Sequence, residues 1–325
     1  MKNTLAFIKL ARPLNLVIIA ATLYAMRYWV LLPMLEPKNF ELPSSLGLFT
    51  LLVISVVMIA AGGNIINDYF DTKTDAVNKP GRMIVGVHLD RRVALYSHGI
   101  LTFLGIGLGA YYGYQTGTLR FIVLHVFVAI SLWYYSTYFK RETPLGNFVI
   151  ALLTGLVPLT IGFFDLFPIV KSVSKETATE LADQGLSLMV YFKILIYWIL
   201  GFSLFAFWGN LIRELLKDLA DLKGDIKAGR RTLPIVLGEK GGLWISVGYV
   251  LVWCLGLLIV EWQFLDSTLS LCYILGLLIF PMLAILAMMF RFPNEKTYKR
   301  AATGVKWILF FGLCFSYFVK TIVFE

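Results

Sequence analysis

Long apolar stretches separated by short polar ones dominate this chain of 325 residues. A helix needs about 20 mainly apolar residues to cross the hydrocarbon core of a bilayer. Nine stretches approach that length, at about residues 14–33, 45–66, 93–114, 119–138, 146–165, 190–212, 241–261, 269–290 and 304–323. The pattern predicts an all-α, polytopic membrane protein with nine transmembrane helices, organised as a single domain over residues 1–325.

Composition supports the same fold class. The chain is 58% hydrophobic and 15% charged, whereas soluble domains average about half and about a quarter. The basic start of the chain runs into the first apolar stretch without a small-residue cleavage site, so we expect an uncleaved first helix. The three cysteines, Cys254, Cys272 and Cys314, each lie in an apolar stretch without metal-type spacing, and we interpret them as small buried hydrophobes.

The basic residues are placed asymmetrically along this pattern. Most of the 29 lysines and arginines fall at the N-terminus and in the connections after the second, fourth, sixth and eighth stretches. Cytoplasmic loops carry such an excess, so the bias predicts that the N-terminus and these connections are cytoplasmic, in the inner membrane of the cell. The net charge of +9 then reflects membrane orientation, and we expect no nucleic-acid partner. The connection 166–189 is expected on the outer side, with a short surface helix.

Two acidic segments follow the second and the sixth stretch and share the spacing D-x-x-D-x-x-x-D. The first is the triplet Asp68, Asp71 and Asp75, and the second is Asp218, Asp221 and Asp225. On a helix, positions i, i+3 and i+7 share one face, so each segment can present a stripe of carboxylates. Both stripes are predicted on the same side of the membrane.

Carboxylates at the bilayer centre would cost about 2.5–3.5 kcal/mol each, so we expect the two stripes to border a wet cavity or the interface. Oxygen ligands without nearby His or Cys favour Mg²⁺, which proteins commonly hold with carboxylates and substrate phosphates. Lysines and arginines close to both segments suit phosphate oxygens. The pattern therefore indicates a diphosphate site. A solvated helix end is the ordinary explanation for one acidic run, and two matching runs on one side argue against it.

The segments "NDYFDTKTD" and "DLADLKGD" resemble the two aspartate-rich motifs of the UbiA superfamily of intramembrane prenyltransferases. The resemblance covers nearly the whole chain. It implies a helical bundle around a central cavity, capped by short cytoplasmic helices. It also implies that the six aspartates named above bind Mg²⁺ and a prenyl diphosphate and are catalytic, together with Lys140 at the end of the fourth stretch.

The same resemblance, with the basic residues near the motifs, gives a set of candidate substrate-binding residues. Arg82 matches the family's basic residue after the first motif, and one of three tyrosines is expected beside the reacting carbon. Lys227, Arg230 and Arg231 are candidates for a second phosphate. The set is Asn64, Asn67, Lys79, Arg82, Tyr134, Tyr135, Tyr138, Asn147, Lys227, Arg230 and Arg231.

Within the superfamily, "GNFVIALLTG" and "KDLADLKGDIKAGRRTLP" resemble most the digeranylgeranylglyceryl phosphate synthases. This implies transfer of a geranylgeranyl group from its diphosphate to the glycerol hydroxyl of geranylgeranylglyceryl phosphate, a lipid-soluble acceptor, with no obligatory protein partner. Three alternatives stay open. They are C-prenylation of an aromatic quinone precursor, a cation-coupled transporter, and a non-catalytic lipid-binding scaffold. A transporter would hold its charges near the midplane in broken helices, whereas these charges lie at helix ends.

Overall fold

The computed structural model describes every residue except 1, 79–80, 82, 142–143, 174–186 and 325. Within that part of the chain all regular elements are helical, and nine helices are long and apolar enough to cross a membrane. Their spans are Pro13–Lys38, Leu46–Phe70, Arg91–Gln115, Leu119–Thr137, Leu145–Ser172, Met189–Lys227, Leu233–Leu265, Thr268–Arg291 and Glu295–Phe318. The predicted fold class is confirmed, and each predicted stretch overlaps one of these spans.

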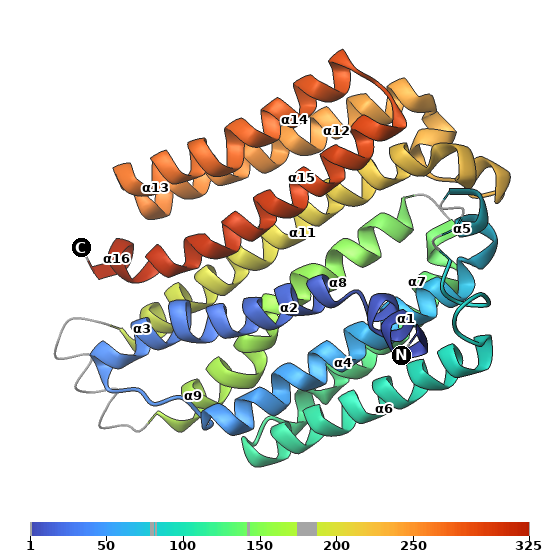
Figure 1. The fold of residues 1–325 in the computed structure, drawn as a ribbon. Helices are drawn as coiled ribbons and strands as arrows, with labels where there is room; N and C mark the ends of the chain where they lie inside the picture. The colour runs from blue at the N-terminus through green and yellow to red at the C-terminus, as the bar shows by residue number, and fades with distance from the viewer. Residues whose placement is uncertain (1, 79–80, 82, 142–143, 174–186, 325) are drawn as a thin grey trace.

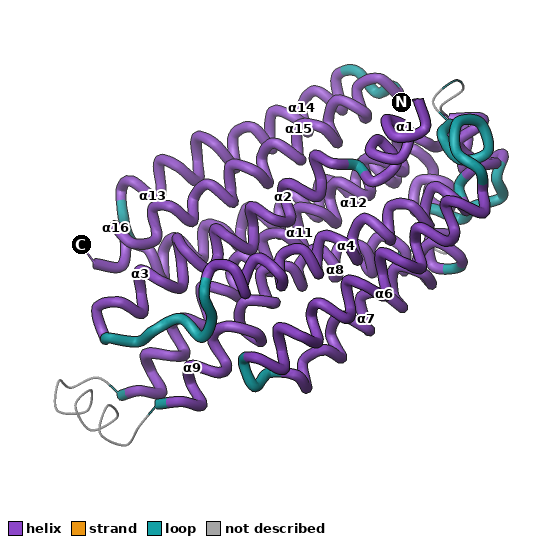
Figure 2. The backbone as a smooth tube through the Cα atoms, turned by 60° about the horizontal axis from the view of Figure 1, so that its bottom comes forward, coloured by secondary structure: helices purple, strands orange, loops and turns teal. Residues whose placement is uncertain are grey.

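The helices run along a common direction, and most connections lie at the two ends of the bundle (Figure 1, Figure 2). Several spans contain a short stretch of another helical type, so that one span comprises more than one element. The α-helices are α1 Lys2–Ala11, α2 Pro13–Ala25, α3 Leu32–Leu35, α4 Leu46–Phe70, α5 Thr72–Asn78, α6 Arg91–Gln115, α7 Ile122–Thr137, α8 Leu145–Ile161, α9 Phe167–Ser172, α11 Leu188–Lys227, α12 Leu233–Val260, α13 Thr268–Tyr273, α14 Phe280–Arg291, α15 Glu295–Cys314 and α16 Val319–Phe324.

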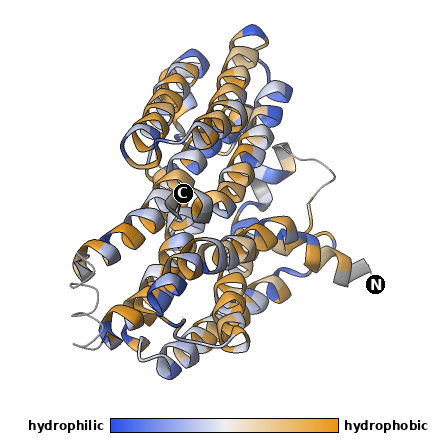
Figure 3. Ribbon diagram, turned by 90° about the vertical axis from the view of Figure 1, so that its left-hand side faces the viewer, coloured by the Kyte–Doolittle hydropathy of each residue, from blue (hydrophilic) through white to orange (hydrophobic). Residues whose placement is uncertain are grey.

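Helix α11 links the two halves of the bundle. It lies between α8 on one side and α12 and α15 on the other (Figure 1). One core cluster joins α11 with α12, α14 and α15, and a second joins its beginning with α2, α4 and α8. Many large apolar side chains remain outside these cores, for example Phe103 and Trp262, each 77% exposed. Hydrophobic residues cover most of each helix (Figure 3), as the lipid environment of a multi-pass membrane protein requires.

The second acidic segment is helical, as its spacing predicts, but the helix that carries it is longer than the predicted stretch 190–212. Residues 213–240 were expected to be a polar connection, but α11 continues to Lys227. The reason lies in Leu215, Leu216 and Leu219, which recur at helical spacing and are at most 2% exposed. At 1.5 Å per residue, the 40 residues of α11 extend about 60 Å, twice the hydrocarbon thickness of about 30 Å.

Two helix breaks shape the end of the bundle where the acidic segments lie. Arg12 adopts a left-handed conformation (φ 57°) between α1 and α2. The helix breaks here because Pro13 disfavours the right-handed helical conformation at the preceding residue. Asp71 ends α4, and α5 begins one residue later. The expected short helix in 166–189 falls largely on residues outside the described part. The N-terminus lies at the same end as α5, and the C-terminus lies at the opposite end (Figure 1).

Candidate active site

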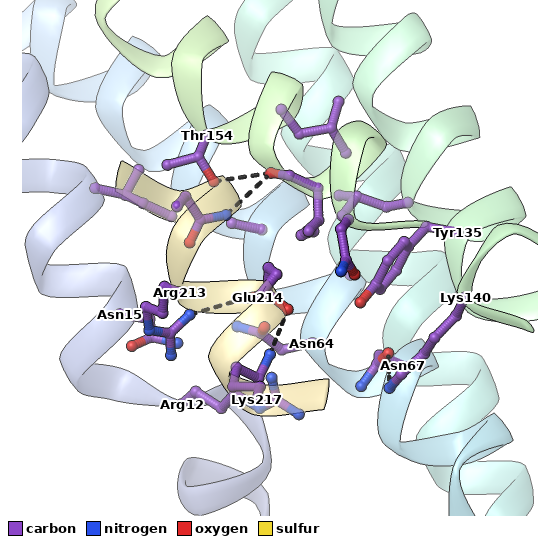
Figure 4. Close-up of a pocket in the computed structure, with 18 of the residues that line it drawn as sticks. Arg12, Asn15, Asn64, Asn67, Tyr135, Lys140, Thr154, Arg213, Glu214 and Lys217 are labelled. Carbon is purple, nitrogen blue, oxygen red and sulfur yellow. Dashed lines mark hydrogen bonds and ion pairs between the residues drawn. The ribbon is translucent and has the colours of Figure 1, made fainter. Parts of the chain in front are cut away.

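A cavity of about 610 Å³ opens among α2, α4, α7, α8, α11 and α15, and all six motif aspartates line it. Sites for small ligands commonly enclose about 300–1,000 Å³. The two acidic segments are 150 residues apart in the sequence yet face the same space, with Asn64, Asn67, Tyr135, Lys140, Asn147 and Arg230 between and around them. Figure 4 shows Asn67 on α4 across from Arg213 and Lys217 on α11, with Asn64 close to Glu214.

The first acidic segment is held by a network centred on Asp71. Asn67, one turn earlier, donates to Asp71 Oδ2 over 3.0 Å and accepts from Lys140 Nζ over 3.0 Å. Lys140 also pairs directly with Asp71. Burial by itself would raise the pKa of the Asp71 carboxyl, but the charges of Lys140 and Arg230 outweigh it and hold the pKa below its ordinary value. Asp71 is therefore an ionised carboxylate at neutral pH.

Arg230 joins the two acidic segments directly. Its guanidinium lies 2.6 Å from Asp71 Oδ1 and 3.1 Å from Asp225 Oδ1. The link depends on the local fold after α11, where Gly229 takes a left-handed φ of 68° that reverses the chain and returns Arg230 to the cavity. Nearby, Asn147 on α8 donates to Asp218 Oδ2 over 2.7 Å. One cation therefore bridges carboxylates from both segments.

Arg12 adds a contact that the sequence did not indicate. Its Nη2 atom lies 2.5 Å from Asp68 Oδ1, so the break between α1 and α2 places a guanidinium over the first segment. Left-handed backbone at a residue other than glycine is uncommon and often occurs at functional sites. The sequence pattern places Arg12 only among the basic residues near the N-terminus that indicate the orientation of the chain. The Arg-Pro dipeptide next to an apolar stretch was the available signal.

Glu214 on α11, with Arg213 and Lys217 around it, is a further charged group that the sequence pattern did not indicate as part of the site. Glu214 accepts from Arg213 Nη1 at 3.0 Å and from Lys217 Nζ at 2.6 Å, and all three side chains line the cavity. Glu214 lies four residues before Asp218, so the acidic stripe begins one turn earlier than the motif. Lys306 on α15 also lines the cavity, where its Nζ donates to Asn15 Oδ1 over 2.7 Å.

The lining changes from charged to apolar along the helices. On α4 the apolar lining residue Val56 lies about three helical turns before the polar Asn67. On α8 the apolar Val157 lies nearly three turns after the polar Asn147. Val128 stands two turns from Tyr135 on α7, and leucines and isoleucines from the same helices complete this section. The cavity thus combines a charged end with an apolar section that points into the bundle.

Several predicted substrate-binding residues lie away from the cavity. Tyr134 and Tyr138 are 52% and 58% exposed on the outer surface, because only Tyr135 of the three tyrosines is on the inner face of α7. Lys227 and Arg231 are also exposed and do not line the cavity, since they flank the turn that sends Arg230 inward. Their expected substrate contacts are therefore not supported by the geometry. Lys79 and Arg82 lie outside the described residues.

Comparison with known proteins places this architecture in a family. The chain is 30% identical over 201 residues to the digeranylgeranylglyceryl phosphate synthase of Thermococcus gammatolerans, covering 62% of this chain and 61% of that protein. It is 29% identical over 245 residues to the enzyme of the same name from Pyrococcus abyssi, covering 74% and 72%. The matches thus span 61% and 72% of the length of these relatives.

Solved structures share the fold over nearly the full length. A structure of a digeranylgeranylglyceryl phosphate synthase in membranes superposes with a TM-score of 0.62 at 24% identity, covering 99% of this chain and 100% of that one. A UbiA homolog from Archaeoglobus fulgidus, bound to DMAPP and Mg²⁺, gives a TM-score of 0.59 at 16% identity and covers 97% and 99%. The model of the UbiA prenyltransferase family matches residues 15–314. This chain belongs to the UbiA prenyltransferase family.

Proposed function

We propose that this protein transfers a geranylgeranyl group from geranylgeranyl diphosphate to the glycerol hydroxyl of geranylgeranylglyceryl phosphate. The observation that carries the proposal is the single cavity lined by both aspartate segments, with Lys140 and Arg230 beside them. The names of the relatives support the same donor and acceptor. The reaction replaces the allylic C–O bond of the donor by an ether bond and releases diphosphate and a proton.

The donor set fits Mg²⁺. All six motif side chains offer carboxylate oxygens, the ligands that this ion prefers. Within the described residues no three of them converge on one point as they stand, and Arg230 instead bridges Asp71 and Asp225. A cation between carboxylates of the two segments is what a diphosphate–metal site requires. We assign Asp68, Asp71, Asp75, Asp218, Asp221 and Asp225 as the metal-holding set, where bound Mg²⁺ supplies charge stabilisation to the leaving diphosphate.

Lys140 and Arg230 are positioned to bind the diphosphate oxygens. Negative charge grows on the diphosphate as its C–O bond breaks, and cations fixed at that place stabilise the transition state more than the ground state. Both side chains are held by Asp71, so they need little reorganisation. Asn67 orients Lys140 through its amide oxygen. These residues therefore supply the electrostatic part of the reaction.

Tyr135 and the apolar section serve the other half of the donor. Tyr135 is 7% exposed and lines the cavity, so its ring offers an electron-rich face to a cationic allylic carbon, worth about 0.5–2 kcal/mol. The apolar section suits the isoprenoid tail and excludes water that would otherwise capture the carbocation. Asn64 holds the end of α1 against α4 by donating to Ala11 O over 3.0 Å. Asn147 positions Asp218 through the hydrogen bond described above.

We infer that this end of the bundle faces the cytoplasm. The inference rests on the excess of lysine and arginine in the connections at the end where α1 and α5 lie. Introducing single cysteines at Lys296 and at Ser172, in a background where the native cysteines are replaced, tests it in intact cells. A membrane-impermeant thiol reagent should modify the cysteine at position 172 and spare the one at position 296. The reverse labelling would contradict the orientation.

A product assay tests the activity. The purified protein is incubated with radiolabelled geranylgeranyl diphosphate and either geranylgeranylglyceryl phosphate or an aromatic quinone precursor such as 4-hydroxybenzoate. Label should enter the glyceryl acceptor, fall at least 100-fold in EDTA and return with added Mg²⁺. Label in the aromatic product alone would indicate C-prenylation, and incorporation that persists undiminished in EDTA would rule out the metal-dependent mechanism.

A further inference from the structure

A second group of cations lines the cavity on the side away from Lys140. Arg213 and Lys217 lie on α11 beside Arg12, which precedes α2, and Asn15 of α2, whereas Lys140 and Asn67 lie across the cavity (Figure 4). Lys306 reaches the same place from α15 through its 2.7 Å hydrogen bond to Asn15. Two helices therefore contribute to a group that we call the α11–α15 cation group, made of Arg213 and Lys217 on α11 and Lys306 on α15.

Positive charge exceeds negative charge in this group. Glu214 is the carboxylate that pairs with Arg213 and Lys217 among the described residues, and Lys306 is held by a neutral amide. The charges of Arg213 and Lys306 repel each other across the gap between α11 and α15. In addition, Arg213 Nε is buried with no hydrogen-bond partner. Within this group, three cations and one paired carboxylate leave about two positive charges and one buried donor without a partner, and such a local excess is costly inside a membrane.

The excess matches a phosphate monoester. Such a group carries about −1.5 to −2 charges at neutral pH and offers several strong acceptor oxygens. Lysine and arginine together suit it through point charge and paired donors. The proposed place of the donor's diphosphate is beside Lys140 and Arg230, which both pair with Asp71. A second anion of this size therefore has its own place in the cavity.

We propose that the α11–α15 cation group, Arg213, Lys217 and Lys306, binds the phosphate monoester of the acceptor lipid. The proposal rests on the function proposed above, since the acceptor there is a glycerol lipid with its own phosphate. It replaces the expectation from sequence that Lys227, Arg230 and Arg231 hold this phosphate. Lys227 and Arg231 are exposed outside the cavity, and Arg230 pairs with Asp71 and Asp225. Lys217 is adjacent to Asp218, so the acceptor phosphate is held directly beside the second acidic segment.

Steady-state kinetics with each substrate varied in turn test the proposal. In Lys306→Met and Arg213→Gln, the KM for geranylgeranylglyceryl phosphate should rise about 10-fold or more, because a charge-assisted contact is lost. The KM for geranylgeranyl diphosphate should stay within about twofold of wild type. Lys306→Arg keeps the charge and should recover most of the acceptor affinity. Lys299→Met, on an exposed position of the same helix, is the matched control and should behave as wild type.

Two further ligands separate the possible sources of the anion. Geranylgeranylglycerol, which lacks the phosphate, should be a weak acceptor for wild type and lose nothing further in Lys306→Met. Inorganic phosphate at millimolar concentration should compete weakly with the acceptor and leave the donor KM unchanged. Inorganic phosphate that raises the thermal unfolding midpoint as much as the lipid acceptor would assign the group to free phosphate and overturn the proposal.

The outcomes distinguish the two proposals. A donor KM that rises with the acceptor KM, or an acceptor KM unchanged in both variants, overturns the acceptor site and leaves the proposed reaction intact. Wild type that makes no glyceryl product while prenylating another acceptor overturns both. If Lys306→Met does not fold, the proposal is tested on Arg213→Gln by measuring how far the acceptor raises its thermal unfolding midpoint. The lipid acceptor should raise the unfolding midpoint of wild type and fail to raise that of the variant.

Discussion

The bundle contains a second buried cluster of charge, and it contrasts with the cavity. Arg27, Tyr112 and Asp165 are all fully buried. Arg27 lies 12 residues after Asn15 along the first span, about 18 Å farther into the bundle. Its Nη1 donates to Ser44 Oγ over 2.9 Å and lies 3.5 Å from Asp165 Oδ2, and its guanidinium stacks 4.1 Å from the ring centroid of Phe49.

The difference between the two regions is one of space and charge balance. In the Arg27 cluster one cation meets one carboxylate. Tyr112 donates its hydroxyl proton to Asp165 and accepts from Ser44 Oγ, and none of these side chains lines the cavity. The cavity holds more cations and carboxylates than pair with one another, around room for a ligand. Buried charge in a membrane is therefore not by itself a sign of catalysis. An unfilled space with uneven charge is the better indicator.

The largest effect should come from removing the carboxylate that joins the walls of the cavity. Asp71→Asn should lower kcat/KM on the order of 10⁴-fold, about 5 kcal/mol, because Lys140 and Arg230 lose their shared partner and the proposed metal site loses a ligand. The radiolabel assay measures this change. Asp90→Asn, at the exposed start of α6, is the control and should retain wild-type activity. Activity above one tenth of wild type in Asp71→Asn would show that the charged cavity is no more important for catalysis than the Arg27 cluster.

The Arg27 cluster should respond in stability instead. Arg27→Met leaves Asp165 without its cation, and breaking a buried ion pair costs about 3–5 kcal/mol of unfolding free energy. Unfolding in mixed micelles measures the loss, while KM values of the folded fraction should remain unchanged. The double variant Arg27→Met/Asp165→Leu should recover much of the stability. A selective loss of substrate affinity in Arg27→Met would show that the Arg27 cluster contributes to substrate binding and not only to stability.

A smaller effect is expected where α4 and α6 pack beside the cavity. A Cβ atom at Gly105 would lie 2.9 Å from Ser55 O and 2.8 Å from Ile59 Cγ1, so Gly105→Ala should cost about 1–2 kcal/mol of stability. Gly107 on the same helix faces open space, and Gly107→Ala should be neutral or slightly stabilising. Comparing the unfolding free energies of the two variants tests the contact. Equal values would show that the helices separate freely there.

The smallest effect should come from basic residues outside both regions. Lys227→Gln should change kcat/KM by less than about threefold, because the side chain is exposed and does not line the cavity. Lys140→Gln, at the cavity, is the matched comparison and should reduce kcat/KM far more. The same steady-state assay measures both. A tenfold loss of kcat/KM in Lys227→Gln would show that Lys227 binds substrate although it does not line the cavity.

The sequence alone determined the membrane-spanning helices and the two acidic segments. Apolar runs of sufficient length can satisfy their backbone groups in lipid only as helices, so the nine spans follow from local composition. The spacing of Asp218, Asp221 and Asp225 likewise depends only on helix geometry. What local patterns could not provide was the end of α11, since its continuation depends on burial of Leu215 and Leu219 by other helices.

Only the tertiary structure decided which charges meet. Arg12 reaches Asp68 across 56 residues, and Arg230 reaches Asp71 across 159. Tyr135 lines the cavity while Tyr134 and Tyr138 face outward, because one turn of α7 can direct only part of its circumference inward. Arg27 and Asp165, 138 residues apart in the sequence, pair for the same reason. Which charged residues pair depends on how the helices pack against one another. The sequence shows which residues share a helix face, but it does not show which other helix that face contacts.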